Sequence, residues 1–174
     1  LIINGGKKLD SNIEYTIIPD RIEAGTFLIA SAMTKGHITI NKIIPNHLRI
    51  VIDKLRECGN DIIEGNDFIK IISDQSKIFP VNIKTEIYPG FPTDLQAQWM
   101  ALMTQAEGNS SITENIYKDR FTHISELTRF GARIILKNNI AKILGNDKLA
   151  AAPVMSTDIR ASAGLIIAAL GAEG

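Results

Sequence analysis

The sequence predicts an α/β fold in which one unit of strands and helices is repeated along the chain. Blocks of sequence recur at an offset of 72 residues, which separates Gly36 from Gly108 and Gly59 from Gly131. Strand-like and helix-like segments alternate within each block, as they do in α/β proteins. Because one repeat cannot bury its own apolar face, neighbouring copies must pack together. We therefore expect a single, partial domain with repeats near 14–74, 84–146 and 153–174.

The elements of the first repeat follow from hydrophobic spacing. The segment RIEAGTFLIASAM is apolar almost all round, so we expect it to form a central helix with the sheets outside it. NHLRIVIDKLREC instead has one apolar stripe, which is typical of a helix that covers a sheet. The expected strands are 14–18, 37–42, 61–64 and 67–73, and the expected helices are 21–34 and 46–58.

The second repeat has the same order of elements, and the third is cut short. Its first helix, LQAQWMALMTQA, is again apolar almost all round. The third copy begins with STDIRASAGLIIAAL and stops inside the unit, so we expect the chain to be a piece of a longer polypeptide. The expected strands of the second repeat are 84–88, 109–116, 132–136 and 139–144, and its helices are 95–106 and 121–130.

Composition argues against two classes of partner. The chain has 19 basic and 19 acidic residues and no basic stripe, which argues against nonspecific binding to nucleic acid. The uncharged stretch 161–172, which no other exceeds in length, is far shorter than the ~20 apolar residues that a membrane span needs. We therefore expect no nucleic-acid partner and no membrane partner.

Cysteine and histidine offer little chemistry. The single cysteine, Cys58, cannot form an intramolecular disulfide, and the sequence has no metal-ligand constellation. Phe130 occupies the position of Cys58 in the second repeat, so we interpret the cysteine as a core residue rather than a nucleophile. His37 and His47 are interpreted as having no catalytic role, whereas a role for His123 stays open.

An aspartate stands immediately before each predicted central helix: Asp20, Asp94 and Asp158. Each has the position of an N-cap, where its side chain accepts hydrogen bonds from free main-chain amides. If the helices begin at one end of the domain, their amides and dipoles also favour an anion there. Capping and a site for a phosphate or carboxylate ligand both stay open.

Three segments carry a resemblance to a known family. They are PDRIEAGTFLIASAMTKG, FPTDLQAQWMALMTQAEGNSSITENIYKDRFTHISELTRFGARI and STDIRASAGLIIAA. They closely resemble the UDP-N-acetylglucosamine 1-carboxyvinyltransferase family, and the similarity runs over essentially the whole chain. The resemblance implies an inside-out α/β barrel of the enolpyruvyl transferase type, with pseudo-threefold βαβαββ units. This chain would supply most of one of the family's two domains.

The resemblance implies transfer of the enolpyruvyl group of phosphoenolpyruvate to the 3-hydroxyl of UDP-N-acetylglucosamine, with release of phosphate. This is the first committed step of peptidoglycan synthesis, in the bacterial cytoplasm, and it needs no cofactor. A positioned carboxylate can deprotonate a hydroxyl when water is excluded. Asp94, in FPTDLQAQ, matches the family residue that contacts the 3-hydroxyl and acts as the base.

Further site residues are implied by the same match. Ile116 matches the position whose main chain meets the nucleotide-sugar. Tyr117 matches a position where the family usually has an aromatic residue near the uracil. Arg120 matches an arginine whose guanidinium could hold a diphosphate or carboxylate bidentately, although a structural role stays open. Possible site-lining residues at the cleft, for which a structural role also stays open, are Asp20, Arg21, Asp158 and Arg160.

Parts of the family pattern are absent from this sequence. The reactive cysteine and the phosphoenolpyruvate-binding basic residues of the other domain have no counterpart, and neither does an arginine-containing C-terminal segment. Because holding both substrates together supplies much of the rate, we expect the 174-residue piece not to turn over alone. We also expect its uncovered apolar surface to promote self-association.

Two other functions stay open. The sister family, 3-phosphoshikimate 1-carboxyvinyltransferase, shares the fold and chemistry but does not normally carry FPTDLQAQ and ITENxxxxRF in this form. A noncatalytic repeat module that binds a nucleotide or a partner is the other alternative. Tight binding of UDP-N-acetylglucosamine by the isolated chain would favour that module.

Overall fold

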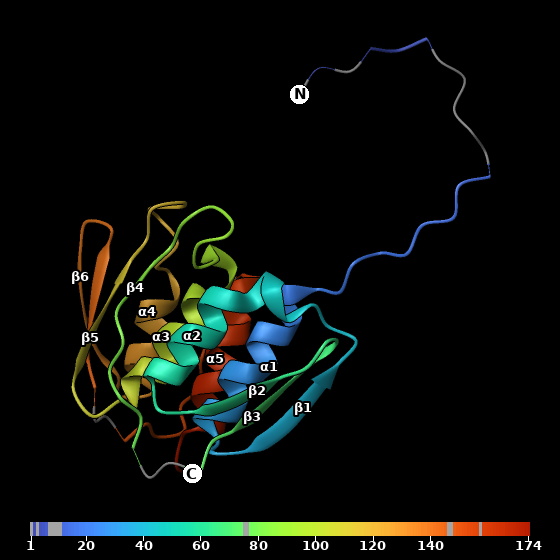
Figure 1. Cartoon of the computed structure of the whole chain (residues 1–174). Coiled ribbons are helices and arrows are strands. Elements are labelled where there is room, and N and C mark those ends of the chain that lie inside the picture. The colour runs from blue at the N-terminus through green and yellow to red at the C-terminus, as the bar shows by residue number, and fades with distance from the viewer. Residues whose placement is uncertain (1, 3, 7–11, 75–76, 146–147, 157) are drawn as a thin grey trace.

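A computed structural model describes residues 2, 4–6, 12–74, 77–145, 148–156 and 158–174. The chain alternates helices and strands, as expected (Figure 1). The elements are α1 (Arg21–Met33), β1 (His37–Asn41), η1 (Pro45–Leu48), α2 (Arg49–Glu57), β2 (Asp61–Glu64), β3 (Phe68–Ile72), β4 (Ile83–Lys84), η2 (Thr93–Leu95), α3 (Gln96–Thr104), β5 (Asn109–Thr113), α4 (His123–Arg129), β6 (Arg133–Lys137), β7 (Ile140–Leu144) and α5 (Ile159–Leu170).

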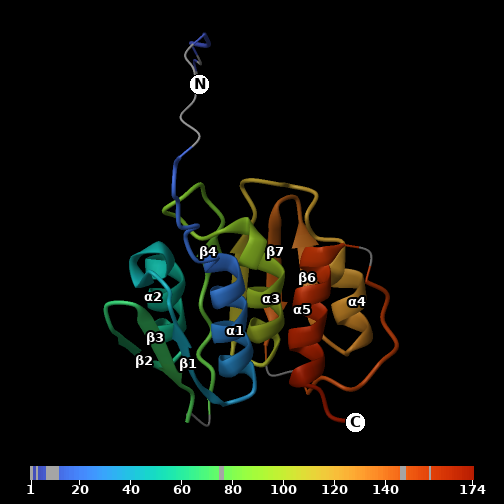
Figure 2. The same cartoon turned by 90° about the vertical axis from the view of Figure 1, so that its right-hand side faces the viewer.

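The helices α1, α3 and α5 lie side by side in the middle of the molecule (Figure 2). Every residue of α3 is buried, as its lack of a polar face predicts. The contact between α3 and α5 is close because Gly164 faces Ala97, where an added Cβ would lie 2.9 Å from the main-chain carbon of Ala97. The prediction of central helices with sheets outside them is confirmed.

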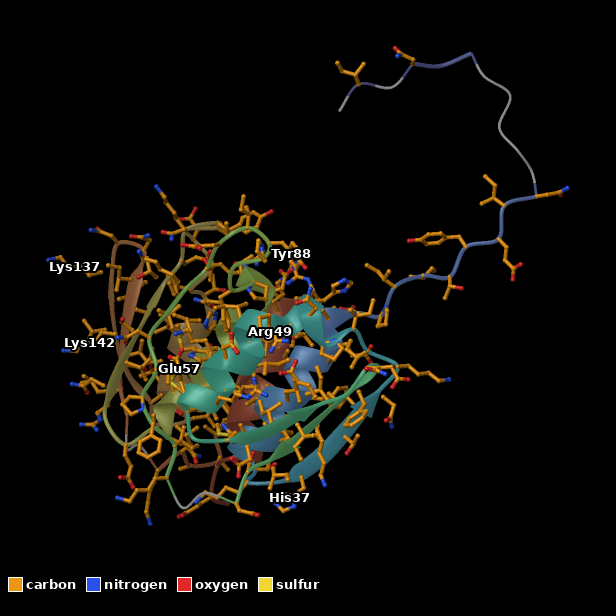
Figure 3. All side chains as sticks on the ribbon, in the orientation of Figure 1. His37, Arg49, Glu57, Tyr88, Lys137 and Lys142 are labelled. Carbon is orange, nitrogen blue, oxygen red and sulfur yellow. The ribbon has the colours of Figure 1, made fainter. Side chains whose placement is uncertain are left out.

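Within the described residues, the strands form one sheet on each side of the central helices. One is antiparallel with the order β1-β3-β2, and the other has the order β4-β5-β7-β6, with β4 parallel to β5. Alternate residues such as Ile112 and Ile143 face the core. On the opposite face Lys137 and Lys142 point away from the helices (Figure 3). The helix α2 buries Val51 and other residues of its stripe, as its pattern predicts.

The predicted strand over 14–18 is wrong. Residues 12–20 form no strand and run away from the body of the molecule (Figure 1). Their apolar side chains are exposed, with Tyr15 at 76% and Ile17 at 84%. The corresponding strand of the second unit, β4, is stabilised by parallel pairing with β5. β-propensity without a neighbouring strand or a packing surface does not produce a strand.

Other element boundaries differ by a few residues. The strand expected over 84–88 is the short β4, because residues 87–90 form a turn. The helix expected over 95–106 begins at Gln96, after the 3₁₀ turn η2. The predicted end of the second repeat at 146 lies outside the described residues, as does residue 157 of the STDIRAS segment. Thus the order of the elements follows the sequence pattern more closely than their ends do.

Candidate functional site

Asp94 does not cap its helix, whereas the other two aspartates do. The Asp20 carboxylate accepts hydrogen bonds from the amides of Ile22 (2.7 Å) and Glu23 (3.2 Å), and Asp158 accepts one from the amide of Arg160 (2.9 Å). These two capping predictions are confirmed. Asp94 lies inside η2, which separates it from the start of α3, and it makes no capping hydrogen bond. The capping interpretation of Asp94 is therefore wrong.

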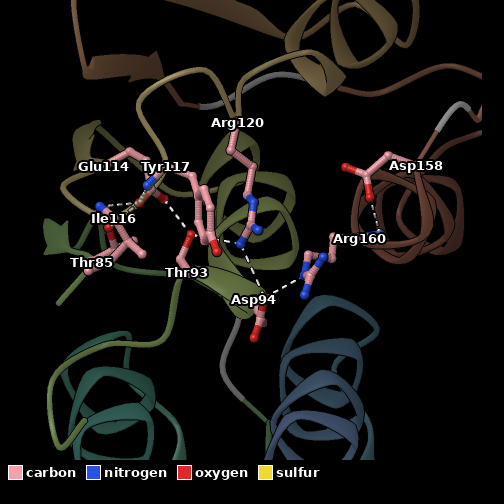
Figure 4. Close-up of polar contacts among 9 residues, drawn as sticks. All are labelled: Thr85, Thr93, Asp94, Glu114, Ile116, Tyr117, Arg120, Asp158 and Arg160. Atoms are coloured by element: carbon pink, nitrogen blue, oxygen red, sulfur yellow. Dashed lines mark hydrogen bonds and ion pairs between the residues drawn. The ribbon is translucent and has the colours of Figure 1, made fainter. Parts of the chain in front are cut away.

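Two arginines from distant parts of the sequence converge on Asp94 (Figure 4). Arg120, from the loop before α4, places Nη1 3.1 Å from Asp94 Oδ1, and Arg160, from the first turn of α5, donates through Nε to the same oxygen. Among the described residues, Oδ2 of Asp94 has no hydrogen-bond partner. The site thus presents a carboxylate with one oxygen held by cations and the other available to a ligand.

Partial exposure suits this cluster to ligand binding. The side chain of Arg120 is 15% exposed, that of Asp94 34% and that of Arg160 44%. Ion pairs that are this open to water contribute no more than about 1 kcal/mol to stability. Guanidinium groups near such a surface have further donors, which can hold a phosphate or a carboxylate bidentately.

Glu114 is a buried residue of the site that the sequence analysis missed. It follows β5 and is 0% exposed. Its donors are the hydroxyls of Thr85 (2.6 Å) and Thr93 (2.9 Å) and the amides of Ile116 (2.9 Å) and Tyr117 (3.0 Å). An acidic residue directly after a buried strand needs local donors, but the expected strand over 109–116 contains Glu114 and hid this signal.

Hollows lie on both sides of the cluster of Asp94 and its arginines. One, of about 410 Å³, is lined by Asp94 and Arg160 together with Asp20 and Gln98. The other, of about 580 Å³, is lined by Arg120 and by a second set of predicted residues, namely Ile116, Tyr117 and Asp158. The Tyr117 ring stacks on the Arg120 guanidinium, with 4.3 Å from its centroid to Cζ. The structure therefore brings these predicted residues together around Asp94.

Arg21 is the predicted site residue that lies elsewhere. Its guanidinium carbon is 5.1 Å from the centroid of the Tyr88 ring, and it lines neither hollow. Tyr88 also meets the ring of His47 edge-on, with 6.4 Å between centroids. Arg21 thus contacts the loop before η2 rather than Asp94.

Cys58 and His123 are buried, whereas His37 lies at the surface. Burial raises the pKa of the Cys58 thiol to about 12, so it stays protonated and is not a nucleophile at neutral pH. Burial lowers the pKa of His123 to about 4, although Asp158 acts in the opposite direction, so this imidazole is neutral at pH 7. His37 pairs with Asp74 at the surface.

In the part of the chain that the structure describes, no helix combines the length and apolar character needed to cross a membrane. Over the same residues, no three His, Cys, Asp or Glu side chains gather as metal ligands. The polar groups of the candidate site include carboxylates, guanidiniums, hydroxyls and main-chain amides.

Comparison with known proteins places this architecture in a family. The family model described as EPSP synthase (3-phosphoshikimate 1-carboxyvinyltransferase) matches residues 1–174. The chain belongs to this family. Among solved structures it is similar to the enolpyruvyl transferase NikO from Streptomyces tendae, with 27% identity and a TM-score of 0.81 over 91% of this chain and 38% of NikO. The expected inside-out α/β fold is confirmed.

Curated relatives are more similar in sequence. The UDP-N-acetylglucosamine 1-carboxyvinyltransferase of Afipia carboxidovorans is 50% identical over 174 residues, which are 100% of this chain and 40% of the relative. The Synechocystis protein of the same name is 50% identical over 175 residues and 39% of its length. The resemblance seen in the sequence is confirmed, and the chain spans about 40% of the length of the curated relatives it matches.

The EPSP synthase from Acinetobacter baumannii shares the fold alone. It is 14% identical to this chain, with a TM-score of 0.69 over 92% of this chain and 39% of that protein. It is therefore much less similar in sequence to this chain than the curated relatives are.

Proposed function

We propose that the protein carrying this chain transfers the enolpyruvyl group of phosphoenolpyruvate to the 3-hydroxyl of UDP-N-acetylglucosamine and releases phosphate. Relatives with the corresponding name are 50% identical over the whole chain, whereas the compared EPSP synthase structure is 14% identical. The observation that carries the proposal is Asp94, whose Oδ1 is held by Arg120 and Arg160 and whose Oδ2 has no partner among the described residues.

In this proposal, Asp94 is the base that accepts the proton of the 3-hydroxyl. A general base must lie within hydrogen-bond reach of the proton that it abstracts, and the unpartnered Oδ2 provides such an acceptor. The guanidiniums keep the carboxylate oriented through Oδ1. Loss of the proton lets the sugar oxygen bond to C2 of phosphoenolpyruvate while C3 takes up a proton. In the elimination step C3 then gives up a proton, the double bond forms again, and the C2–O bond to phosphate breaks, so that phosphate leaves.

The hollow beside Ile116 and Tyr117 is the proposed position of the nucleotide-sugar. Its volume of about 580 Å³ and its mixture of an aromatic ring with charged side chains support this assignment. Arg120 borders this hollow and also contacts Asp94, so its guanidinium can meet an anionic group of a substrate next to the base. Asp20, Asp158 and Arg160 are proposed as residues lining the remaining cleft.

A second domain of the same polypeptide is proposed to complete the site. The side chain of Asp94 is 34% exposed, whereas the proposed chemistry requires that water be excluded from the base. The chain spans 40% of the length of its Afipia relative, so the remaining part of that relative is long enough to form a further domain. We propose that the 174-residue piece does not turn over alone.

The test is phosphate release by the complete gene product with phosphoenolpyruvate and one of two acceptors. We expect release with UDP-N-acetylglucosamine and none above background with shikimate 3-phosphate. The reverse preference would assign the sister activity instead. Silence with both acceptors, combined with tight binding of UDP-N-acetylglucosamine, would favour a noncatalytic binding module.

A further inference from the structure

Glu114 joins two parts of the candidate site through its two oxygens. Oε1 accepts from the Thr85 hydroxyl and from the amides of Ile116 and Tyr117. Oε2 accepts from the Thr93 hydroxyl at 2.9 Å and from no other described residue. Burying a carboxylate away from water is strongly destabilising unless hydrogen-bond donors surround it. Glu114 has such donors from three places: the residue after β4, the turn η2 and the loop after β5 (Figure 4).

The direction of the hydrogen bonds links Glu114 to Arg120. A carboxylate only accepts, so the single proton of the Thr93 hydroxyl is directed at Glu114 Oε2. The lone pairs of that hydroxyl are then left to accept from Arg120 Nη1, which lies 2.9 Å away. The same Nη1 lies 3.1 Å from Asp94 Oδ1. A continuous chain of polar contacts thus runs from Glu114 to the proposed base (Figure 4).

We propose that Glu114 is the positioning residue of this site. It orients the Thr93 hydroxyl, which fixes the Arg120 guanidinium against Asp94, and it holds the main chain at Ile116 and Tyr117. Glu114 acts only through these groups, because its own side chain is fully buried. The inference rests on the proposed function and deepens it, since a displaced Arg120 would leave both Asp94 and an anionic substrate group misaligned.

A pair of threonine variants separates positioning from structural support. Thr85→Val and Thr93→Val each remove one hydroxyl from Glu114, but only Thr93 also contacts Arg120. In the complete gene product, we expect Thr93→Val to lower kcat by about 10- to 100-fold, the scale of misplaced reacting groups. Thr85→Val should lose at least as much thermal stability, because the amide of Asn115 loses its acceptor too, yet keep kcat within about threefold.

Glu114→Gln tests whether the effect of Thr93 passes through the carboxylate. Glutamine keeps one acceptor oxygen for the main-chain amides but can present an NH₂ donor to the Thr93 hydroxyl, which breaks the ordered chain. We expect kcat of Glu114→Gln to fall as much as that of Thr93→Val. The variant that combines both substitutions should have a kcat no lower than that of either single variant. The matched control is Glu64→Gln on β2. The Glu64 carboxylate pairs with Arg49 and Arg56 outside the candidate site, so this substitution should leave kcat unchanged.

The inference is overturned if Glu114→Gln retains the wild-type kcat, or if the losses of Glu114→Gln and Thr93→Val multiply in the double variant. A second measurement does not depend on activity: amide hydrogen exchange over residues 115–120 in Glu114→Ala and wild type. Faster exchange in the variant supports the inference, and unchanged exchange contradicts it. If wild type releases no phosphate, the proposed function fails, while the exchange experiment still decides the role of Glu114.

Discussion

At the scale of single residues, Asp94 differs from the two aspartates that precede the other central helices. Asp20 and Asp158 accept hydrogen bonds from helix amides, as expected for N-caps. The turn η2 instead places Asp94 where Arg120 and Arg160 reach it. Equivalent positions in a repeat have therefore acquired different chemical environments, and the local sequence around each aspartate does not reveal which one meets the arginines.

His123 gives a residue-scale prediction about pH. Its pKa is about 4 in the folded protein, below the ordinary value of 6.5, so between these values the unfolded chain binds a proton that the folded chain does not. Stability from the neutral, buried imidazole is present above pH 6.5 and is lost as pH falls toward 4, by at most about 3 kcal/mol. Thermal midpoints from pH 7 to 4 should fall less steeply in His123→Gln than in wild type. Parallel pH profiles would contradict this account.

At the scale of elements, the contact between α3 and α5 depends on a single glycine. A Cβ at Gly164 would lie 2.9 Å from main-chain atoms of Ala97, and a backbone contact of this kind yields only if the helices move apart. We expect Gly164→Ala to destabilise the domain by about 1–3 kcal/mol, the usual range for overpacking. Denaturant unfolding of the complete gene product measures this change.

The matched control for this substitution is Gly5→Ala. No heavy atom lies within 4 Å of a Cβ added at Gly5, so its stability should change by less than about 0.5 kcal/mol. Equal stability of Gly164→Ala and wild type would show that the two helices are not held at this separation.

Element type was largely predictable from the sequence, and the reasons for the exceptions are physical. The uniformly apolar α3 and the striped α2 follow from residue spacing, because burial on all sides or on one side is a property of the segment itself. Residues 14–18 have a strand-like composition, but a strand depends on a partner that is distant in sequence. Boundaries such as the start of α3 depend on local turns like η2.

The candidate site was predictable in part. The resemblance indicated Asp94, Ile116 and Arg120, and the structure places them around the two hollows. Glu114 was missed because its importance comes from four donors that fold around it, two of which are threonines on other elements. The contact of Arg160 with Asp94 likewise joins residues 66 positions apart. The repeat boundaries stay a prediction.

At the scale of the whole molecule, an apolar face on α1 and α5 is uncovered. Phe27 is 56% exposed, Ile166 62% and Leu170 55%. Large contiguous apolar surfaces promote association in water. We expect the isolated 174-residue chain to sediment as dimers or larger species, and Ile166→Glu to shift it toward monomer. A clean monomer of the wild-type chain at micromolar concentration would contradict this expectation.

The central claim is that Asp94, oriented by Arg120 and Arg160, is the base of an enolpyruvyl transfer. The most direct measurement compares kcat for phosphate release from phosphoenolpyruvate and UDP-N-acetylglucosamine in wild type, Asp94→Asn and Asp61→Asn, each as the complete gene product. Asp61 is an exposed residue of β2 and serves as the control. We predict a loss of about 100-fold or more in Asp94→Asn and no loss in Asp61→Asn. An Asp94→Asn variant as fast as wild type would contradict the account.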